Sequence, residues 1–306
     1  MLVDGIWCDD EDRFMRDGAF HRETSPMPSD LSDGMIEAIR STPQRFVLVA
    51  SQSCPWSHGA VLARVLQGLS ERLPLQPAGG ARIEGYGLLP GPITERHGYR
   101  HVHQLYSATD PTYTGRSTVP LLWDVETERC LSNDSVSIMR ALDVAGSGPD
   151  FRPPDLDADI DALNSRIYDG LSNAVYRAGL AEQQGAYDEA IEIVFSTLDD
   201  LEARLSGQAF LFGADLVETD LRLFATLVRF DTVYATHFRC TRKRLVDYPA
   251  LWRYARRLYQ LPGVAQTVDF DEIRKGYYLN DGSHNPHGIV AAQPEIDWME
   301  AVGPSR

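Results

Sequence analysis

The chain has 306 residues, of which 43% are hydrophobic and 24% are charged, as is typical of a globular protein with one large or two ordinary domains. Its formal net charge of −15 disfavours binding to nucleic acids and to anionic membranes, because both require clustered cations. The sequence has no run of about eighteen apolar residues and its start lacks the pattern of a signal peptide, so we expect a cytoplasmic protein.

The cysteines are too widely spaced to indicate a disulfide framework or a zinc site. They are Cys8, Cys54, Cys130 and Cys240. We therefore expect no metal, and likewise no flavin and no nucleotide cofactor.

The first 45 residues show scattered Asp, Pro and Ser with little periodicity. We expect residues 1–45 to form an arm of extended chain or short elements that wraps the first domain.

A cysteine lies between a predicted strand and a predicted helix. The apolar run 46–50 predicts the strand, and apolar residues recur with helical spacing from Val61 to Leu69. Pro55 suits the first helical position, so Cys54 lies at the helix start, where free N–H groups and the helix dipole stabilise a thiolate. The pattern favours a nucleophile; a buried, inert cysteine is the alternative.

Residues 73–106 form an irregular stretch rich in Gly and Pro that also carries titratable side chains. These include Glu95, Arg96, His97, His101 and His103. A loop of this length within a compact domain is usually functional or disordered, and a loose polar loop is the alternative interpretation.

Two further features follow the loop. Pro120 stands at the head of an apolar strand pattern that runs to Trp123, a position that a proline tolerates. Asp134 and Ser135 open a predicted helix, where they can cap the helix, place N–H groups and a hydroxyl on an anionic ligand, or do both.

Gly, Pro and Asp at 146–155 predict a linker, and beyond it the apolar spacing is helical throughout. The sequence thus divides into the arm 1–45, an α/β domain 46–145, the linker 146–155 and an all-helical domain 156–306.

The motif Cys54-Pro55-Trp56-Ser57-His58 is similar to the Cys-Pro-Trp-Ala-His of the glutathionyl-hydroquinone reductases, the xi-class glutathione transferases. The resemblance covers about residues 46–296 and is densest in the helical half. It includes Asn173-Ala174-Val175-Tyr176-Arg177-Ala178-Gly179, Val233-Tyr234-Ala235-Thr236-His237-Phe238-Arg239-Cys240 and Asn285-Pro286-His287-Gly288-Ile289-Val290. It implies the glutathione transferase architecture, a thioredoxin-like α/β domain followed by an all-α domain.

The resemblance also implies a reaction. Cys54 attacks the thioether sulfur of a glutathionyl-hydroquinone or a related aromatic conjugate, and a second glutathione resolves the resulting mixed disulfide. A departing aromatic carbon needs a proton donor. By resemblance Tyr176 is that donor, while Tyr234 and Tyr277 form hydrogen bonds near the sulfur; core packing is the ordinary alternative for any one tyrosine.

Glutathione is the co-substrate that the resemblance implies. The backbone of Val119, before a cis-proline, binds its cysteinyl part, and Asp134 and Ser135 bind its γ-glutamyl end. Because glutathione and this chain are both anionic, a nearby cation is required, and Arg116 is the candidate. The full set of predicted binding residues is Tyr86, Arg116, Ser117, Thr118, Val119, Asp134 and Ser135.

The chain departs from the family pattern at four positions. Tyr86 replaces a glutathione-contacting tryptophan, Gly59 an arginine, Asp134 a glutamate, and Val217 an N-cap threonine. The first three alter the thiol-binding half, so they predict weaker glutathione affinity, a different thiol or a specialised substrate.

Two rival functions stay open on the sequence alone. One is an enzyme that uses bound glutathione as the nucleophile in conjugation or ether cleavage, and the other is non-catalytic binding of aromatic compounds. We also expect a homodimer built through the helical domain.

Overall fold

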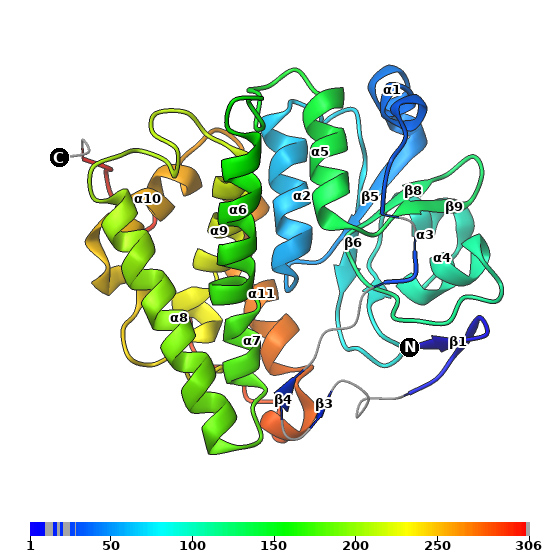
Figure 1. Ribbon diagram of the computed structural model, residues 1–306. Coiled ribbons are helices and arrows are strands. Elements are labelled where there is room, and N and C mark those ends of the chain that lie inside the picture. Colours follow the sequence, from blue (N-terminus) through cyan, green and yellow to red (C-terminus); the bar gives the residue numbers. More distant parts are fainter. Residues whose placement is uncertain (10–14, 17–18, 21–24, 28, 304–306) are drawn as a thin grey trace. The chain divides into compact units, whose positions relative to one another are not determined.

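The computed structural model describes residues 1–9, 15–16, 19–20, 25–27 and 29–303, and the chain divides into two compact units (Figure 1). The first unit comprises Met1–Glu11, Glu23–Pro149 and Thr267–Gly282, and the second comprises Asp12–Arg22, Asp150–Gln266 and Ser283–Arg306. The border between Pro149 and Asp150 falls inside the predicted linker. Thr267–Gly282, which chain order would assign to the helical domain, belongs to the first unit.

The first unit is built on a five-stranded sheet with the order β7-β6-β5-β8-β9. Its central pair, β5 and β6, is parallel, and the other pairs are antiparallel. The strands are β5 (Phe46–Ala50), β6 (Leu75–Gly79), β7 (Gly87–Leu88), β8 (Leu121–Asp124) and β9 (Arg129–Ser132). The predicted strand 46–50 is confirmed, and its residues are all buried because helices cover the sheet on both faces.

Helices pack on both faces of this sheet. In Figure 1, α2 (Pro55–Leu66) and α5 (Ser135–Ala145) lie side by side on one face, and α3 (Pro92–His97) and α4 (Val102–Thr109) lie on the other. The alternation of strand side chains sends Val47 and Val49 into the cluster that also contains Leu105 of α4. The unit also holds α1 (Asp33–Ser41), α11 (Phe270–Tyr278) and the hairpin of β1 (Leu2–Val3) and β2 (Ile6–Trp7).

The stretch 73–106 is not a loose loop, because it contains β6, β7, α3 and α4. These elements are short. The Gly and Pro residues that make the sequence look like a loop mark where the elements begin and end. Pro92 occupies the first position of α3, and Gly98 ends that helix in the left-handed conformation with φ of 73°.

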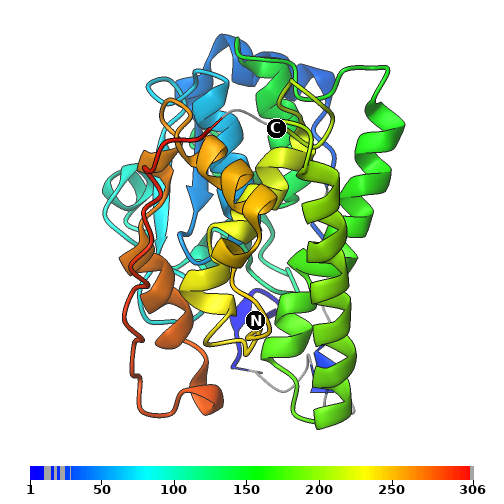
Figure 2. The same ribbon diagram turned by 90° about the vertical axis from the view of Figure 1, so that its left-hand side faces the viewer.

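The second unit is helical, as predicted, with one short hairpin of β3 (Met15–Arg16) and β4 (Ala19–Phe20). Its helices are α6 (Asp157–Ile167), α7 (Ala174–Gly179), α8 (Gln184–Leu205), α9 (Glu218–Leu227) and α10 (Pro249–Tyr259). Figure 2 shows the 22-residue α8 running along one side of the unit. Two π-helical turns, Tyr168–Ser172 and Phe230–Tyr234, interrupt the expected regular helices. In the described part of the chain, no helix is both long and apolar enough to cross a bilayer.

Candidate functional site

Cys54 is the N-cap residue of α2 and follows the short turn 51–53 after β5, so it lies between a strand and a helix as the sequence predicts. Its Sγ lies 3.4 Å from the backbone N of Ser57, which donates to it, and 3.3 Å from the carbonyl oxygen of Val119. A backbone N–H group and the N-terminus of α2 thus face the sulfur on one side, and the Val119 carbonyl oxygen faces it on the other. Cys54 is buried, with 7% of the residue exposed.

Val119 precedes the cis peptide bond to Pro120, as the resemblance implies. The residues before it are held from the side by buried groups. Tyr106 donates to the Thr118 carbonyl over 2.9 Å and accepts a bond from Asn133 over 2.9 Å. Burial raises the pKa of Tyr106 far above its ordinary value, so its hydroxyl stays a donor. The predicted Ser117, Thr118 and Val119 thus lie on a segment that the protein fixes in place.

Tyr106 and Asn133 were not predicted from the sequence. Each acts through the backbone or side chain of Thr118, 12 and 15 residues away along the chain. A second tyrosine holds the same segment two residues earlier, because Tyr113 donates to the carbonyl of Arg116 over 3.0 Å.

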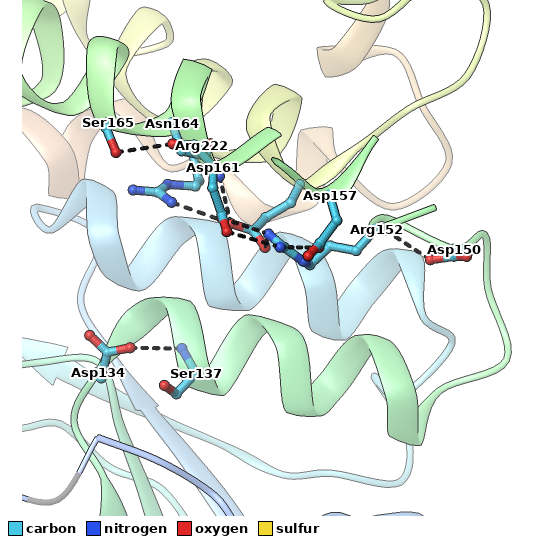
Figure 3. Close-up of polar contacts among 10 residues, drawn as sticks. Asp134, Ser137, Asp150, Arg152, Asp157, Asp161, Asn164, Ser165 and Arg222 are labelled. Atoms are coloured by element: carbon cyan, nitrogen blue, oxygen red, sulfur yellow. Dashed lines mark hydrogen bonds and ion pairs between the residues drawn. The ribbon is translucent and has the colours of Figure 1, made fainter. Parts of the chain in front are cut away.

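Asp134 is the N-cap of α5, and its Oδ1 accepts a 2.8 Å bond from the N–H of Ser137 (Figure 3). Ser135 is the first residue of that helix. The capping role is therefore confirmed, and binding of a γ-glutamyl group by Asp134 and Ser135 stays a prediction.

A cation that no sequence motif indicates lies beside the loop that carries the cysteine. Arg82 donates to Tyr86 Oη over 2.9 Å and to Ser53 Oγ over 3.2 Å, and its guanidinium lies 4.4 Å from the centre of the Tyr86 ring. Ser53 is the residue before Cys54. Arg82 therefore offers positive charge next to Tyr86, and its position four residues before Tyr86 was the available sequence signal.

The segment that carries Tyr277 packs against the same loop. A Cβ on Gly276 of α11 would lie 2.4 Å from the Cβ of Ser53, so glycine permits this close approach. His58 Nε2 lies 2.8 Å from Thr267 Oγ1, which ties α2 to the start of the segment. Tyr277, 5% exposed, thus belongs to the same unit as Cys54, on a helix that contacts the neighbour of the cysteine.

Tyr176 and Tyr234 belong to the second unit, where the structure brings them together. Their ring centroids are 6.0 Å apart, and Phe238 lies 5.1 Å from Tyr176 and stacks on Tyr234 at 5.5 Å. Gly179 lets Phe238 approach α7, since a Cβ there would meet the Phe238 ring at 2.2 Å. Tyr176, Tyr234 and Phe238 therefore form one aromatic cluster, in which Tyr234 is fully buried.

Two departures from the family pattern have a structural explanation. Gly59 of α2 faces Met139 of α5, whose sulfur would lie 2.9 Å from an added Cβ, so a larger residue would need the methionine to move. Val217 provides no side-chain cap for α9, as expected, but Asp220 Oδ2 still accepts the Val217 N–H over 2.9 Å. Of the two capping hydrogen bonds, the one that an N-cap side chain would accept is therefore missing and the one to the Asp220 side chain is kept.

Comparison with known proteins gives a consistent result. Residues 184–257 match the family model described as glutathione S-transferase, C-terminal domain. The chain is 40% identical to glutathionyl-hydroquinone reductase PcpF of Sphingobium chlorophenolicum, with 96% of each chain covered. It is 39% identical to glutathionyl-hydroquinone reductase YqjG of Escherichia coli, covering 99% of this chain and 97% of that protein.

Solved structures agree in fold. The glutathione-bound structure of YqjG superposes with a TM-score of 0.85 at 37% identity, covering 99% of this chain and 98% of that one. A xi-class transferase from Natrialba magadii gives a TM-score of 0.86 at 34% identity, covering 99% and 96%. The thioredoxin-like domain followed by a helical domain is thereby confirmed.

Proposed function

The chain belongs to the glutathionyl-hydroquinone reductases, the xi class of glutathione transferases, and from this premise we propose how its own residues carry out the reaction. The Cys54 thiolate attacks the thioether sulfur of a glutathionyl-hydroquinone. The carbon–sulfur bond breaks, its electron pair passes to the aromatic carbon, and that carbon takes a proton. A second glutathione thiolate then attacks the mixed disulfide, so that oxidised glutathione leaves and the Cys54 thiolate is restored.

The observation that carries this proposal is the setting of Cys54. Its sulfur caps α2, faces the Ser57 N–H and lies against Val119, where an incoming glutathione backbone can pair with the chain like an added strand. This setting supports the protein's own sulfur as the nucleophile. It therefore disfavours a mechanism in which bound glutathione attacks, and it disfavours binding without turnover.

In our proposal the three tyrosines have two different roles. Tyr176 protonates the departing carbon, while Tyr234 and Tyr277 donate to the reacting sulfur. The pairing of Tyr176 with Tyr234 in one aromatic cluster supports a common site for the quinol ring.

Glutathione is the co-substrate, and we propose that two cations counter its charge. Arg116 precedes the Ser117–Val119 segment, and Arg82 bridges Tyr86 and Ser53. A tyrosine backed by a guanidinium offers a polar, cationic surface where the family has an apolar indole. Asp134 and Ser135 receive the γ-glutamyl end at the start of α5.

The nucleophile is tested by replacing Cys54 with serine. Cys54→Ser should abolish deglutathionylation without unfolding the protein, because a serine hydroxyl stays protonated at neutral pH. Mass spectrometry of the protein trapped during turnover should find one glutathionyl group on wild-type Cys54 and none on the variant. Cys8→Ser is the control and should keep both the activity and the adduct; a Cys54→Ser rate above about a tenth of wild type would contradict the assignment.

We also propose that the enzyme acts in the cytoplasm as a homodimer formed through the helical unit. The free cysteines of the described residues suit a reducing compartment, where glutathione is abundant, and most soluble homo-oligomers are twofold dimers. Light scattering at micromolar concentration should give twice the chain mass, and a monomer mass would refute the dimer.

A further inference from the structure

Three side chains that commonly bind metals meet at one edge of the first unit, in the stretch around β7 and α4. Glu84 lies before β7, and His101 and His103 lie at the start of α4. Backbone hydrogen bonds of 2.7 Å and 2.9 Å pair residues 86–88 with residues 100–102. This pairing holds the carboxylate and the two imidazoles next to one another without any ligand.

The distances within this cluster are short. His103 Nε2 lies 2.9 Å from Glu84 Oε2, and the two imidazole rings have centroids 5.5 Å apart with 23° between their planes. One ligand atom from each residue lies within 4.8 Å of the other two. The indole of Trp7 covers His103 at a centroid distance of 5.2 Å, and His103 is only 9% exposed.

The hydrogen bond between His103 and Glu84 leaves the hydrogen bonding of His101 unexplained. The Nδ1 of His101 is buried and has no hydrogen-bond partner within the part of the chain that the structure describes. Buried polar atoms are normally satisfied, so an unsatisfied nitrogen on an imidazole that belongs to this cluster supports a missing ligand.

Two imidazoles and one carboxylate are a common zinc ligand set, in which water completes the tetrahedron. Ligand atoms around zinc lie about 3.4 Å apart, as bond lengths of about 2.1 Å require. The Glu84 side chain is 47% exposed and can move by the ångström or so that closure from 4.8 Å needs.

We propose that Glu84, His101 and His103 bind a divalent transition-metal ion, with Zn²⁺ as the best match. The ion ties the loop before β7 to the start of α4, so its effect is on the stability of this edge. None of the three residues is among those proposed to act on sulfur or to bind glutathione, although Glu84 lies two residues before Tyr86.

The test is a calorimetric titration of Zn²⁺ into the desalted full-length protein in a buffer free of thiols. The protein carries Cys8→Ser and Cys54→Ser, because these thiols can also bind zinc. One Zn²⁺ should bind per chain and should raise the melting temperature. Adding Glu84→Gln or His101→Gln should each weaken binding at least about tenfold.

His97→Gln is the matched control, because His97 also pairs with a carboxylate, at 3.5 Å from Glu128, in the same stretch of chain. It should leave Zn²⁺ affinity unchanged. Absence of stoichiometric binding, unchanged affinity in both Glu84→Gln and His101→Gln, or an equal loss in His97→Gln would overturn the proposal. Co²⁺ serves as a second probe: a thiolate charge-transfer band in its complex would place the ion on another cysteine and would also overturn it.

Discussion

Tyr176 is the residue whose proposed role can be isolated by the choice of substrate. If its hydroxyl protonates the departing carbon, Tyr176→Phe should slow the reaction with a glutathionyl-hydroquinone by about 10²–10⁴-fold, the usual worth of general acid catalysis. Reduction of a small mixed disulfide should hardly change, because a thiolate leaves without needing that proton. Rapid-quench rates for both substrates, measured on one preparation, give the comparison.

Tyr234→Phe is the matched control, since its ring lies 6.0 Å from Tyr176 in the same cluster. It should slow both substrates by similar factors, because a hydrogen bond to the sulfur affects the nucleophile and not the leaving group. Equal slowing of both reactions by Tyr176→Phe would make Tyr176 a sulfur ligand or a packing residue. The proton would then come from Tyr277, His58 or water.

Single residues could be predicted where their role follows from local sequence. Cys54 can be recognised because a cysteine and a proline stand within a few residues between a strand pattern and a helix pattern. Arg82 and Asn133 were not, because each acts on a residue distant along the chain: Arg82 on Ser53, 29 residues away, and Asn133 on Tyr106, 27 residues away. Only the fold brings these groups together.

Among the elements of the second unit, α6 and α9 are joined through one arginine in the segment before α6. Arg152 donates to Asp161 over 3.0 Å and to Glu218 over 3.1 Å, and it also contacts Asp157 (Figure 3). Glu218, at the start of α9, is only 2% exposed and also accepts a 2.8 Å bond from Asn164. Burial alone would lower the pKa of Arg152, but the neighbouring carboxylates outweigh it and raise the pKa well above its ordinary value.

Removing Arg152 should therefore destabilise the second unit. Arg152→Met leaves Glu218 buried with Asn164 and Arg222 among its remaining partners, and we expect a loss of about 2–3 kcal/mol in the free energy of unfolding. Urea denaturation followed by circular dichroism measures it. Arg166→Met removes an exposed pair with Asp200 and should cost no more than about 0.5 kcal/mol; equal effects of the two changes would show that the buried contact adds nothing.

Helices could be predicted where apolar residues keep a helical spacing for several turns. The helical spacing from Ile160 onward identified the helical half, although the π-helical turn Tyr168–Ser172 left no mark on the apolar pattern. The stretch 73–106 was misread as a loop, because two-residue β7 and six-residue α3 are too short to show a period.

At the scale of the whole molecule, the order of an α/β part and a helical part could be predicted, but not the composition of the two units. Thr267–Gly282 joins the first unit through contacts such as Gly276 with Ser53, which no local pattern encodes. The same limit applies to the site, since residues from separate stretches of chain surround the predicted nucleophile.

The response of the folded protein to acid depends on the carboxylates that it holds ionised, and Asp124 at the end of β8 is a clear example. Burial alone would raise the pKa of Asp124, but bonds from Arg45, Thr127 and the Glu126 N–H outweigh it and lower the pKa to about 2. A depressed carboxyl pKa stabilises the folded state above the unfolded pKa near 4, and this contribution is lost as the pH falls towards 2.

Asp124→Asn should therefore lower the free energy of unfolding by about 2 kcal/mol at pH 7, the value of a shift of nearly two pKa units. The difference from wild type should shrink as the pH falls from about 4 to about 2, because wild-type Asp124 becomes protonated in that range. Urea denaturation at a series of pH values measures it.

Glu126→Gln is the control: Glu126 lies 3.3 Å from Arg45 but is 60% exposed, so its loss should cost no more than about 0.5 kcal/mol at any pH. A difference for Asp124→Asn that stayed constant down to pH 2 would mean that packing, not charge, is what Asp124 contributes.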